Sequence, residues 1–475
     1  MIGRCTYALV LATALVVTNG NAQTFTGAVR LRGESWQWFD HPTAENSYNY
    51  LGALVRVAVS DQMPRLSWRI ELAAPVLLGL PDDAVAPAPG GQLGAGASYW
   101  QANDSSDNVA NVFLKQAYVR IGKPVAQGGH SVRAGRFEFV DGNELTPANA
   151  TLAALKRDRI AHRLVGNFGW THVQRSFDGA QYGHDRSGQN ITALAVRPTR
   201  GVFDADGWGE LDVALWYASY NRADKHHEWR LFATAYHDYR DDPRPVKTDN
   251  RPLAIRAADT DDISVQTVGG HFLKAIPASF GSIDVLLWGN VQLGDWGALE
   301  HRAVAFSVEA GVQPKLLSWW KPWLRAAYTL TSGDDDPGDD RHATFFPLLP
   351  TPRIYARFPF YSMMNLQDAA LSLVLRPGSK LTLRTEAHWL RLAEAGDLWY
   401  AGGGAFEAET FGYAGRPSNG ADDLARLFDL SADVRVNNNI SINVYGALAR
   451  GGDVIDRIYT DRNASFGYIE LELRK

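Results

Sequence analysis

Cysteine is almost absent from this sequence. The 475 residues contain a single one, Cys5. It lies ahead of the first apolar run, whereas the lipid-carrying cysteine of a lipoprotein stands at the cleavage point. If the first residues are removed on export, the remaining chain has no cysteine. That excludes disulfides and thiol or thiolate–metal chemistry.

Long apolar runs and a charge excess of one sign are also missing. After Val17 no stretch approaches the roughly 20 apolar residues of a transmembrane helix. The formal net charge is -5, and the 47 basic and 52 acidic residues are spread along the chain. Nothing in this distribution suggests nucleic-acid binding.

The N-terminus has the pattern of an export signal. Arg4 provides a positive start, Tyr7 to Val17 is apolar, and Gly20-Asn21-Ala22 supplies small residues at the usual cleavage spacing. We therefore expect a signal peptide over 1–22 and a mature domain over 23–475. The alternative, an N-terminal membrane anchor, needs a longer apolar run than this one.

Aromatic residues and glycine are abundant, and apolar residues alternate with polar ones. The chain has 15 Trp, 18 Tyr, 20 Phe and 44 Gly. The segment 65–72 is typical: every second residue is apolar (Leu66, Trp68, Ile70, Leu72), and arginine, serine or glutamate stands between them. Alternation of period two indicates strands with one apolar and one polar face. Strands of about nine to thirteen residues suit a tilted membrane crossing better than a soluble sheet.

The connections between these segments alternate between short and long. We expect about eighteen strands, at 25–37, 51–60, 65–73, 112–121, 131–139, 176–184, 189–197, 209–218, 228–238, 262–274, 281–293, 302–313, 321–330, 367–376, 379–391, 426–436, 439–449 and 464–474. This rhythm predicts an all-β fold: a transmembrane antiparallel up-and-down β-barrel with short periplasmic turns and long extracellular loops. Both ends of the mature chain then lie on the periplasmic side.

Three connections carry more specific expectations. The gap at 294–301 is the least long of the predicted loops. Pro147 to Arg159 has helical composition and predicts a short helix over or inside the barrel mouth. Ala161 to Trp170 fits either an extra strand or part of a loop.

Arginines on the polar faces are the first candidates for a functional site. In a closed barrel they point into one lumen, where guanidinium groups attract anions and nearby carboxylates keep binding weak enough for release. The alternative is that they fill a wet interior and pair with one another. The arginines are Arg30, Arg32, Arg56, Arg69, Arg120, Arg384 and Arg435, with Glu34, Glu71, Glu386 and Asp433 among them.

Several motifs in order resemble the alginate export family of outer-membrane channels. They are Ala134-Gly-Arg-Phe-Glu-Phe-Val-Asp-Gly142, Arg175-Ser-Phe-Asp-Gly179, and the run from Ser332 to Asp340 that leads through Thr344-Phe-Phe-Pro-Leu-Leu-Pro-Thr351 to Asn365-Leu-Gln-Asp368. The resemblance implies a monomeric eighteen-stranded barrel with an electropositive pore for a polyuronate chain. It further implies that Arg136 and Glu138 point inward near the constriction. Arg175 and Asp178 would stand at the start of the following strand, and 332–351 would fold over or beside the mouth.

The acidic run from Asp334 to Asp340 allows two interpretations. Its carboxylates could hold Ca²⁺, but Pro337 and the missing EF-hand ligand order argue against a dedicated site. A solvated extracellular loop, bridged by divalent ions to lipopolysaccharide, is favoured. No metal or other cofactor is expected.

Three functions remain open at this stage. The favoured one is an outer-membrane channel for an anionic small molecule or polysaccharide. The others are a non-conducting structural or adhesion barrel, and a barrel enzyme that modifies lipids or peptides. Catalysis has little support, because no Gly-x-Ser-x-Gly, His-Glu-x-x-His or phosphate-binding glycine motif is present. The expected partners are the anionic solute, outer-membrane lipid and lipopolysaccharide.

Overall fold

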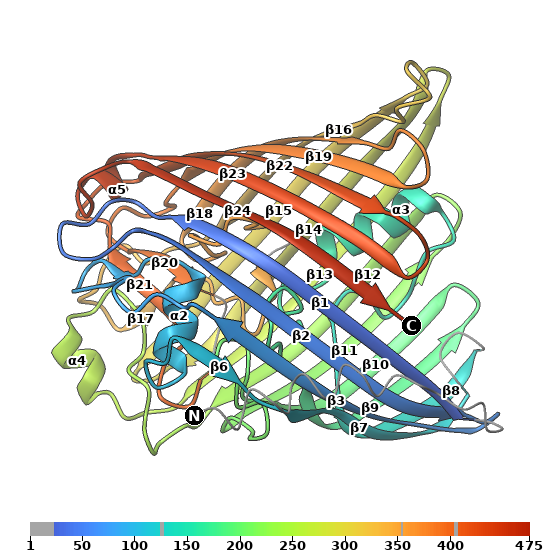
Figure 1. Cartoon of the computed structure of the whole chain (residues 1–475), viewed down its shortest axis with the longest axis horizontal. Helices are drawn as coiled ribbons and strands as arrows, with labels where there is room; N and C mark the ends of the chain where they lie inside the picture. Colours follow the sequence, from blue (N-terminus) through green and yellow to red (C-terminus); the bar gives the residue numbers. More distant parts are fainter. Residues whose placement is uncertain (1–22, 124–127, 353–354, 403–406) are drawn as a thin grey trace.

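The computed structural model describes residues 23–123, 128–352, 355–402 and 407–475. The predicted signal peptide, 1–22, lies outside them. Within the described residues eighteen long antiparallel strands form a closed barrel (Figure 1). They are β1 (Gln23–Gln37), β2 (Ser47–Gln62), β3 (Leu66–Leu78), β7 (Phe113–Gly122), β8 (Gly129–Phe137), β9 (Phe177–Arg186), β10 (Gln189–Pro198), β11 (Val213–Ala223), β12 (His227–Asp238), β13 (Ile263–Ala278), β14 (Gly281–Trp296), β15 (Leu299–Pro314), β16 (Trp323–Thr331), β18 (Leu366–Leu375), β19 (Leu381–Arg391), β22 (Asp423–Arg435), β23 (Ile440–Gly451) and β24 (Asn463–Arg474).

The first and last strands close the barrel. β1 pairs with β24 from Ala28↔Arg474 to Gln37↔Ser465, while its other edge pairs with β2. Closure satisfies the backbone groups that an open sheet edge would expose to lipid, where water cannot replace the hydrogen bonds. The predicted eighteen-stranded barrel is confirmed, and every predicted strand overlaps an observed one.

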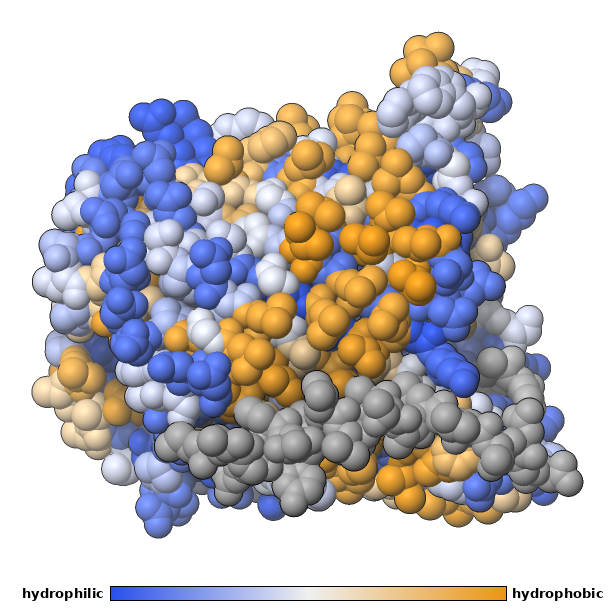
Figure 2. Space-filling model, in the orientation of Figure 1, coloured by the Kyte–Doolittle hydropathy of each residue, from blue (hydrophilic) through white to orange (hydrophobic). Residues whose placement is uncertain are grey.

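Each strand separates an apolar outer face from a largely polar inner face. On β15, Val304, Phe306 and Val308 are exposed on the outside, whereas Ser307 and Glu309 are buried inside. Figure 2 shows apolar side chains gathered in a band across the visible face of the wall. Exposed apolar and buried polar residues invert the pattern of a soluble protein, because the barrel's outer solvent is hydrocarbon.

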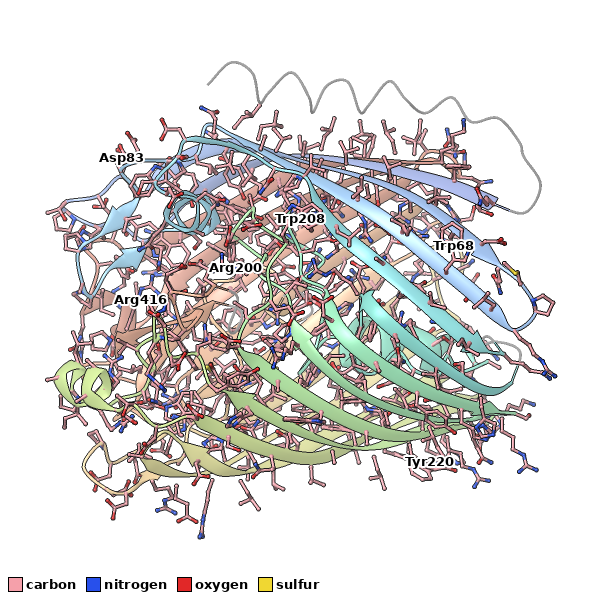
Figure 3. The ribbon with its side chains drawn as sticks, turned by 90° about the horizontal axis from the view of Figure 1, so that it is seen from below. Trp68, Asp83, Arg200, Trp208, Tyr220 and Arg416 are labelled. Carbon is pink, nitrogen blue, oxygen red and sulfur yellow. The ribbon has the colours of Figure 1, made fainter. Side chains whose placement is uncertain are left out.

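The two ends of the barrel differ in their connections. At one end, the turn end, strands are joined by short segments such as Ser187-Gly188 and 436–439; at the other, the loop end, most connections are long. Both Gln23 and Lys475 lie at the turn end. Figure 3 shows the same polarity, with Asp83 and Arg416 at the loop end and Trp68 and Tyr220 toward the turn end.

One loop-end connection is not a loop. β14 and β15 remain paired up to Trp296↔Leu299, so only Gly297 and Ala298 join them. Gly297 has φ +61°, a conformation that glycine adopts without the steric cost of a side chain. The expectation of a loop at 294–301, even the least long one, is therefore corrected to a two-residue turn.

The long connections contain short elements of their own. These are β4 (Val85–Ala86), β5 (Gly91–Gln92), α2 (Ala95–Ala102), β6 (Asn108–Ala110), α3 (Ala150–Leu155), a π turn η2 (Lys156–Ile160), α4 (Leu253–Ala258), β17 (Arg341–His342), β20 (Leu398–Gly402), β21 (Tyr413–Pro417) and α5 (Asp453–Asp456). None of the described helices is long and apolar enough to cross a membrane.

The connection 138–176 folds into the barrel rather than over it. Lys156 Nζ lies 2.6 Å from Glu228 Oε1 on β12, and Thr151 Oγ1 accepts a hydrogen bond from Gln313 near the turn end of β15. The predicted helix is thus confirmed as α3 and η2, inside the lumen. The segment 161–170 makes only an isolated bridge, Val165↔Leu349, and is part of the same loop.

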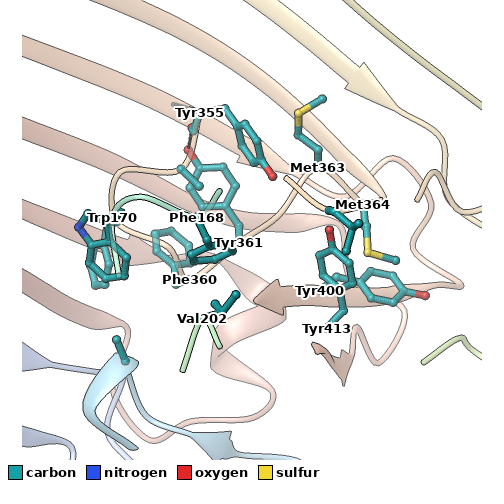
Figure 4. Packing of buried hydrophobic residues seen from close by; sticks show 14 of the residues in the cluster. Phe168, Trp170, Val202, Tyr355, Phe360, Tyr361, Met363, Met364, Tyr400 and Tyr413 are labelled. Carbon is teal, nitrogen blue, oxygen red and sulfur yellow. Dashed lines mark hydrogen bonds between the residues drawn. The ribbon is translucent and has the colours of Figure 1, made fainter. Parts of the chain in front are cut away.

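Aromatic side chains from the long connections pack together in a layer toward the loop end of the barrel. Side chains from two connections interleave there, Phe168 and Trp170 from 138–176 with Tyr355 and Phe360 from 332–365 (Figure 4). Trp36 on β1 connects the layer to the barrel wall, and the centre of its ring lies 4.0 Å from that of Phe466 on β24. The loops therefore divide the lumen.

Candidate pore and its constriction

A large cavity with mostly basic walls occupies the lumen toward the turn end. Its volume is about 750 Å³, and residues next to the turns, such as Ser379, Ser441 and Glu472, line it. We call it the basic chamber. Its charged lining comprises nine basic side chains (Arg30, Arg32, Arg157, Arg159, Arg325, Arg357, Lys380, Arg384 and Arg435) and five acidic ones (Asp158, Glu386, Asp433, Glu470 and Glu472).

A second cavity of about 380 Å³ lies on the loop-end side of the packed layer. We call it the aromatic chamber. Its polar lining includes Thr248, Glu407 and Arg416. Burial raises the pKa of Glu407 to about 7, against its ordinary value near 4.5. The aromatic residues that line it are Trp36, Trp38, Phe168, Trp170, Phe203, Phe411 and Tyr413.

Trp170 lines both chambers. The connections 138–176 and 332–365 each contribute a residue to both chambers. Phe168 and Pro352 line the aromatic chamber, whereas Gly169 and Thr351 line the basic chamber. We call Gly169, Trp170 and Thr351 the constriction. These residues stand where the linings of the two chambers meet.

Hydrogen bonds between the two connections hold the constriction. The Thr351 hydroxyl accepts from the Phe168 amide at 2.9 Å, and the Gly166 amide donates to the Leu349 carbonyl at 2.8 Å. Arg30 on β1 donates to the Gly169 carbonyl at 2.7 Å, which ties the loop to the barrel wall. These residues are far apart in sequence, so the constriction exists only in the folded chain.

Five predicted pore residues line the basic chamber: Arg30, Arg32, Arg384, Glu386 and Arg435. They differ in how their charge is compensated. Arg32 lies 2.6 Å from Glu470 and 3.1 Å from Glu34, so its charge is balanced. Arg435 instead donates to the Ser379 carbonyl at 2.7 Å, which leaves its positive charge in place.

Arg56, Arg69 and Glu138 form a separate network on the inner wall. Arg56 lies 2.9 Å from Glu138, and Arg69 lies 2.7 Å from Glu71. Burial alone would raise the pKa of Glu138, but Lys115 and Arg56 outweigh it and lower that pKa to about 2. Glu138 points inward as expected, within a network whose charges largely cancel.

Arg120 and Arg175 do not line either chamber. Arg120 lies on the inner face of β7 with its guanidinium 6.0 Å from the Tyr118 ring. Arg175 is buried in the loop layer, with its guanidinium 5.5 Å from the Phe168 ring. Burial lowers the Arg175 pKa to about 10. Its place just before β9 agrees with the expectation, but it faces packed side chains rather than the lumen.

Arg136 and Asp178 lie on the outer face of the barrel. The register places them directly opposite each other and on the same face as Val119 and Val132, which are 46% and 50% exposed. Arg136 Nε donates to Asp178 at 2.8 Å and Nη2 donates to the carbonyl of Trp208, on the connection between β10 and β11 (Figure 3).

The expectation that Arg136 points inward is therefore wrong. Arg136 and Glu138 are two residues apart and would share a face if the strand continued. β8 ends at Phe137, however, and the chain turns inward there, so only Glu138 reaches the lumen. Alternation predicts a side chain's face only while the strand lasts.

Comparison with known proteins identifies the family. The sequence model described as "Alginate export" matches residues 23–465, which is most of the 475-residue chain. The chain belongs to the alginate export family. A search of the curated proteins finds no significant match. With the family known, the barrel is an outer-membrane protein, its turn end is periplasmic and its loop end extracellular.

Solved porins share the fold of this alginate export family member. OccK1 (OpdK) of Pseudomonas aeruginosa aligns with a TM-score of 0.54 at 7% identity, over 95% of this chain and 98% of that one. OccK9 (OpdG) of the same organism gives 0.57 at 9%, over 95% and 98%. OccAB4 of Acinetobacter baumannii gives 0.56 at 8%, over 96% and 100%. At these identities the likeness concerns the fold alone.

Several lining residues of this alginate exporter relative were not predicted. Arg157 and Arg159 stand in the segment expected to be helical, so the basic run Lys156-Arg-Asp-Arg159 was a usable signal. Arg357 lies in an irregular connection without periodicity, and nothing local indicates it. Arg325 belongs to the predicted strand 321–330, and its alternation with the outward Leu324 is a signal that indicates its inward side chain.

Glu309 on β15 anchors the loop that forms the constriction. Its carboxylate lies 2.9 Å from Arg159, 3.0 Å from Arg163 and 2.9 Å from Arg325. Two of these arginines belong to the connection 138–176. Burial lowers the pKa of Arg163 to about 10.

Replacing Glu309 by glutamine is expected to destabilise this region. The change leaves three guanidinium groups around a neutral amide, and breaking a buried ion pair costs about 3–5 kcal/mol. The urea midpoint of the refolded barrel should fall, and the connection 138–176 should become sensitive to limited proteolysis. Glu300→Gln, which makes the same change at an exposed position of the same strand, serves as a control. An unchanged midpoint and cleavage pattern for Glu309→Gln would contradict the anchoring role.

The acidic run gives no sign of a metal site. Asp334 is buried and accepts hydrogen bonds from the amides of Asp336 and Ala343, both at 3.2 Å, so it organises the loop itself. Within the described ranges, no group of three or more His, Cys, Asp or Glu side chains could hold a metal ion.

Proposed function

We propose that this outer-membrane barrel is a channel for anionic solutes. The observation that supports the proposal is the excess of basic over acidic side chains lining the basic chamber, nine against five. Excess positive charge at the periplasmic end of the lumen raises the local concentration of anions there.

The arrangement of the uncompensated charges matters as much as their number. Lys380 and Arg435 donate to the carbonyls of Val436 and Ser379, at 3.1 and 2.7 Å. A carbonyl satisfies a hydrogen bond without cancelling a charge, so both cations remain available to a solute. Lys380 stands next to the turn between β18 and β19, and Arg435 is the last residue of β22. Both lie at the periplasmic opening of the lumen, where a solute would enter or leave.

The size of the expected anion preference follows from elementary electrostatics. A unit charge ~10 Å away in water contributes ~0.4 kcal/mol. Four such charges, screened over a Debye length of about 8 Å, give roughly 0.5 kcal/mol, or a two- to three-fold preference for a monovalent anion. Low-dielectric walls strengthen the field, and a polyanion gains more because several of its charges are attracted at once.

The proposed cargo is an anionic small molecule or an anionic polysaccharide. The family's description, alginate export, favours a polyuronate. One neighbour, OpdK, was solved with vanillate, which is also a carboxylate. The proposal gives the chain no catalytic role.

A second candidate is a non-conducting structural barrel. It is favoured by one observation, the packed layer at Trp170 that separates the two chambers. The two functions differ in whether ions cross the constriction, so a conductance measurement decides between them.

Reversal potentials in planar bilayers test the proposal. Under a KCl gradient the refolded mature barrel should conduct and favour chloride. Arg384→Gln, inside the basic chamber, should weaken that preference. Arg136→Gln removes the same charge from the outer face and should leave it unchanged. An absence of conductance would favour the structural barrel, and a cation preference would refute the anion channel.

A further inference from the structure

The turn between β15 and β16 carries a group of exposed apolar side chains. Leu316 is 77%, Leu317 55% and Trp319 64% exposed, and Phe280 on the neighbouring β13–β14 turn is 53% exposed. We call these four residues the apolar tip. The two turns are connected, because the Lys315 amide donates to the Phe280 carbonyl at 2.8 Å and Lys315 Nζ to the Ser279 carbonyl at 3.0 Å.

The apolar tip projects sideways from the barrel wall. Figures 1 and 2 show the end of these hairpins standing out from the outline of the barrel near its turn end, with apolar side chains at the extremity. β13, β14 and β15 are each 16 residues long, whereas β16 has nine, so these hairpins extend further than their neighbours.

The tip is continuous with the lipid-facing surface of the barrel. On β15 the outward side chains Val304, Phe306 and Val308 lead toward it. On β16 the outward, exposed Leu324 pairs with Val312 on β15, just before the turn. Along β15 the apolar band that faces hydrocarbon therefore runs into the tip without a polar break. Continuity with that interface argues for lipid as the occupant.

Two other periplasmic turns have a different composition. Ser187-Gly188 and Asn437-Asn438-Asn439 are polar or small, as expected of turns in water. A single exposed leucine is ordinary, but a cluster of large apolar side chains in water is not, since burying such side chains away from water is favourable. Lys315 and Lys321 flank the cluster. Tryptophan with lysine is the composition of segments at a membrane interface, where the ring is half buried and the ammonium group reaches the headgroups.

We propose that the apolar tip inserts into the periplasmic leaflet of the outer membrane and that Lys315 and Lys321 bind anionic phospholipid headgroups there. This role is independent of solute passage. The tip anchors one side of the barrel in the periplasmic leaflet. The phospholipid molecules next to β13 to β16 are then held in place by contact with it. The alternative occupant of the tip, a second copy of this chain, is distinguished by the experiment.

A single-cysteine fluorescence experiment tests the proposal, because residues 23–475 contain no cysteine. Leu317→Cys, and as a matched control Asn438→Cys on another periplasmic turn, are labelled with an environment-sensitive fluorophore. Each full mature barrel is refolded into phosphatidylcholine vesicles containing phosphatidylglycerol. Nitroxide-labelled phospholipid in the bilayer should quench the label at position 317 strongly and that at 438 weakly. Iodide on both sides of the membrane should do the reverse.

Two further arms give the remaining outcomes. Lys315→Glu with Lys321→Glu, in the Leu317→Cys background, should reduce lipid quenching in vesicles with phosphatidylglycerol and have a smaller effect in pure phosphatidylcholine. Equal iodide quenching at 317 and 438 would overturn the proposal. So would iodide protection at 317 that disappears as the protein is diluted into more lipid, because a second copy would then cover the tip. Conductance of the same samples reports on the proposed function separately.

Discussion

Trp170→Ala is expected to raise single-channel conductance several-fold. Trp170 lines both chambers, so removal of its indole is expected to widen the connection between the basic and aromatic chambers. The Arg32 guanidinium, 5.2 Å from the indole, should keep its position because Glu34 and Glu470 still hold it. Trp170→Phe, which removes less volume, should give an intermediate conductance.

The control for this experiment is another tryptophan truncation. Trp208 is half exposed at the outer rim, so Trp208→Ala should leave conductance unchanged. Planar-bilayer recordings of all three variants, with heat-modifiable migration in gels as the folding check, provide the comparison. If folded Trp170→Ala conducted like the unmodified barrel, ions would not pass between the two chambers at Trp170.

Reversing two charges in the basic chamber is expected to abolish anion preference. Lys380→Glu with Arg435→Glu changes the charge of the lining by four, which equals the excess of nine basic over five acidic side chains. The reversal potential in a KCl gradient should move to near zero. In 1 M salt the difference between the variant and the parent should shrink, because the Debye length is then about 3 Å.

A matched pair separates position from total charge. Arg222 and Lys225 stand at the β11–β12 turn, also at the periplasmic end but outside the lining of the basic chamber. Arg222→Glu with Lys225→Glu alters the net charge by the same amount and should shift the reversal potential far less. Equal shifts for the two pairs would mean that the overall charge of the periplasmic face, and not the chamber, sets selectivity.

The family and the fold are established, so these measurements concern only conduction and ion selectivity. Membership of the alginate export family and the outer-membrane barrel do not depend on them. What they test is whether this lumen conducts, and whether the nine basic side chains around one chamber set the sign of the ion it prefers. The polyuronate cargo is a further question, answered by competition between alginate oligomers and chloride current.

The amino-acid sequence alone determined the barrel. Strand alternation has a period of two residues, so a window such as 65–72 reveals both faces of β3 without knowledge of any partner strand. The short–long order of connections is equally local. Eighteen strands, their approximate bounds and the inward placement of Arg30, Arg32 and Arg384 follow from these two patterns.

Only the tertiary structure decided how the lumen is divided and which charges a solute meets. The bond between Phe168 and Thr351 joins residues 183 positions apart, and no local pattern encodes such a contact. Arg357 enters the basic chamber from an irregular connection for the same reason. Arg136 lies outside because it shares a face of β8 with Val132, whereas Glu138 reaches the lumen because β8 ends at Phe137, a boundary that alternation cannot locate. Local periodicity specifies a wall, whereas the pore within it depends on loops held by long-range contacts.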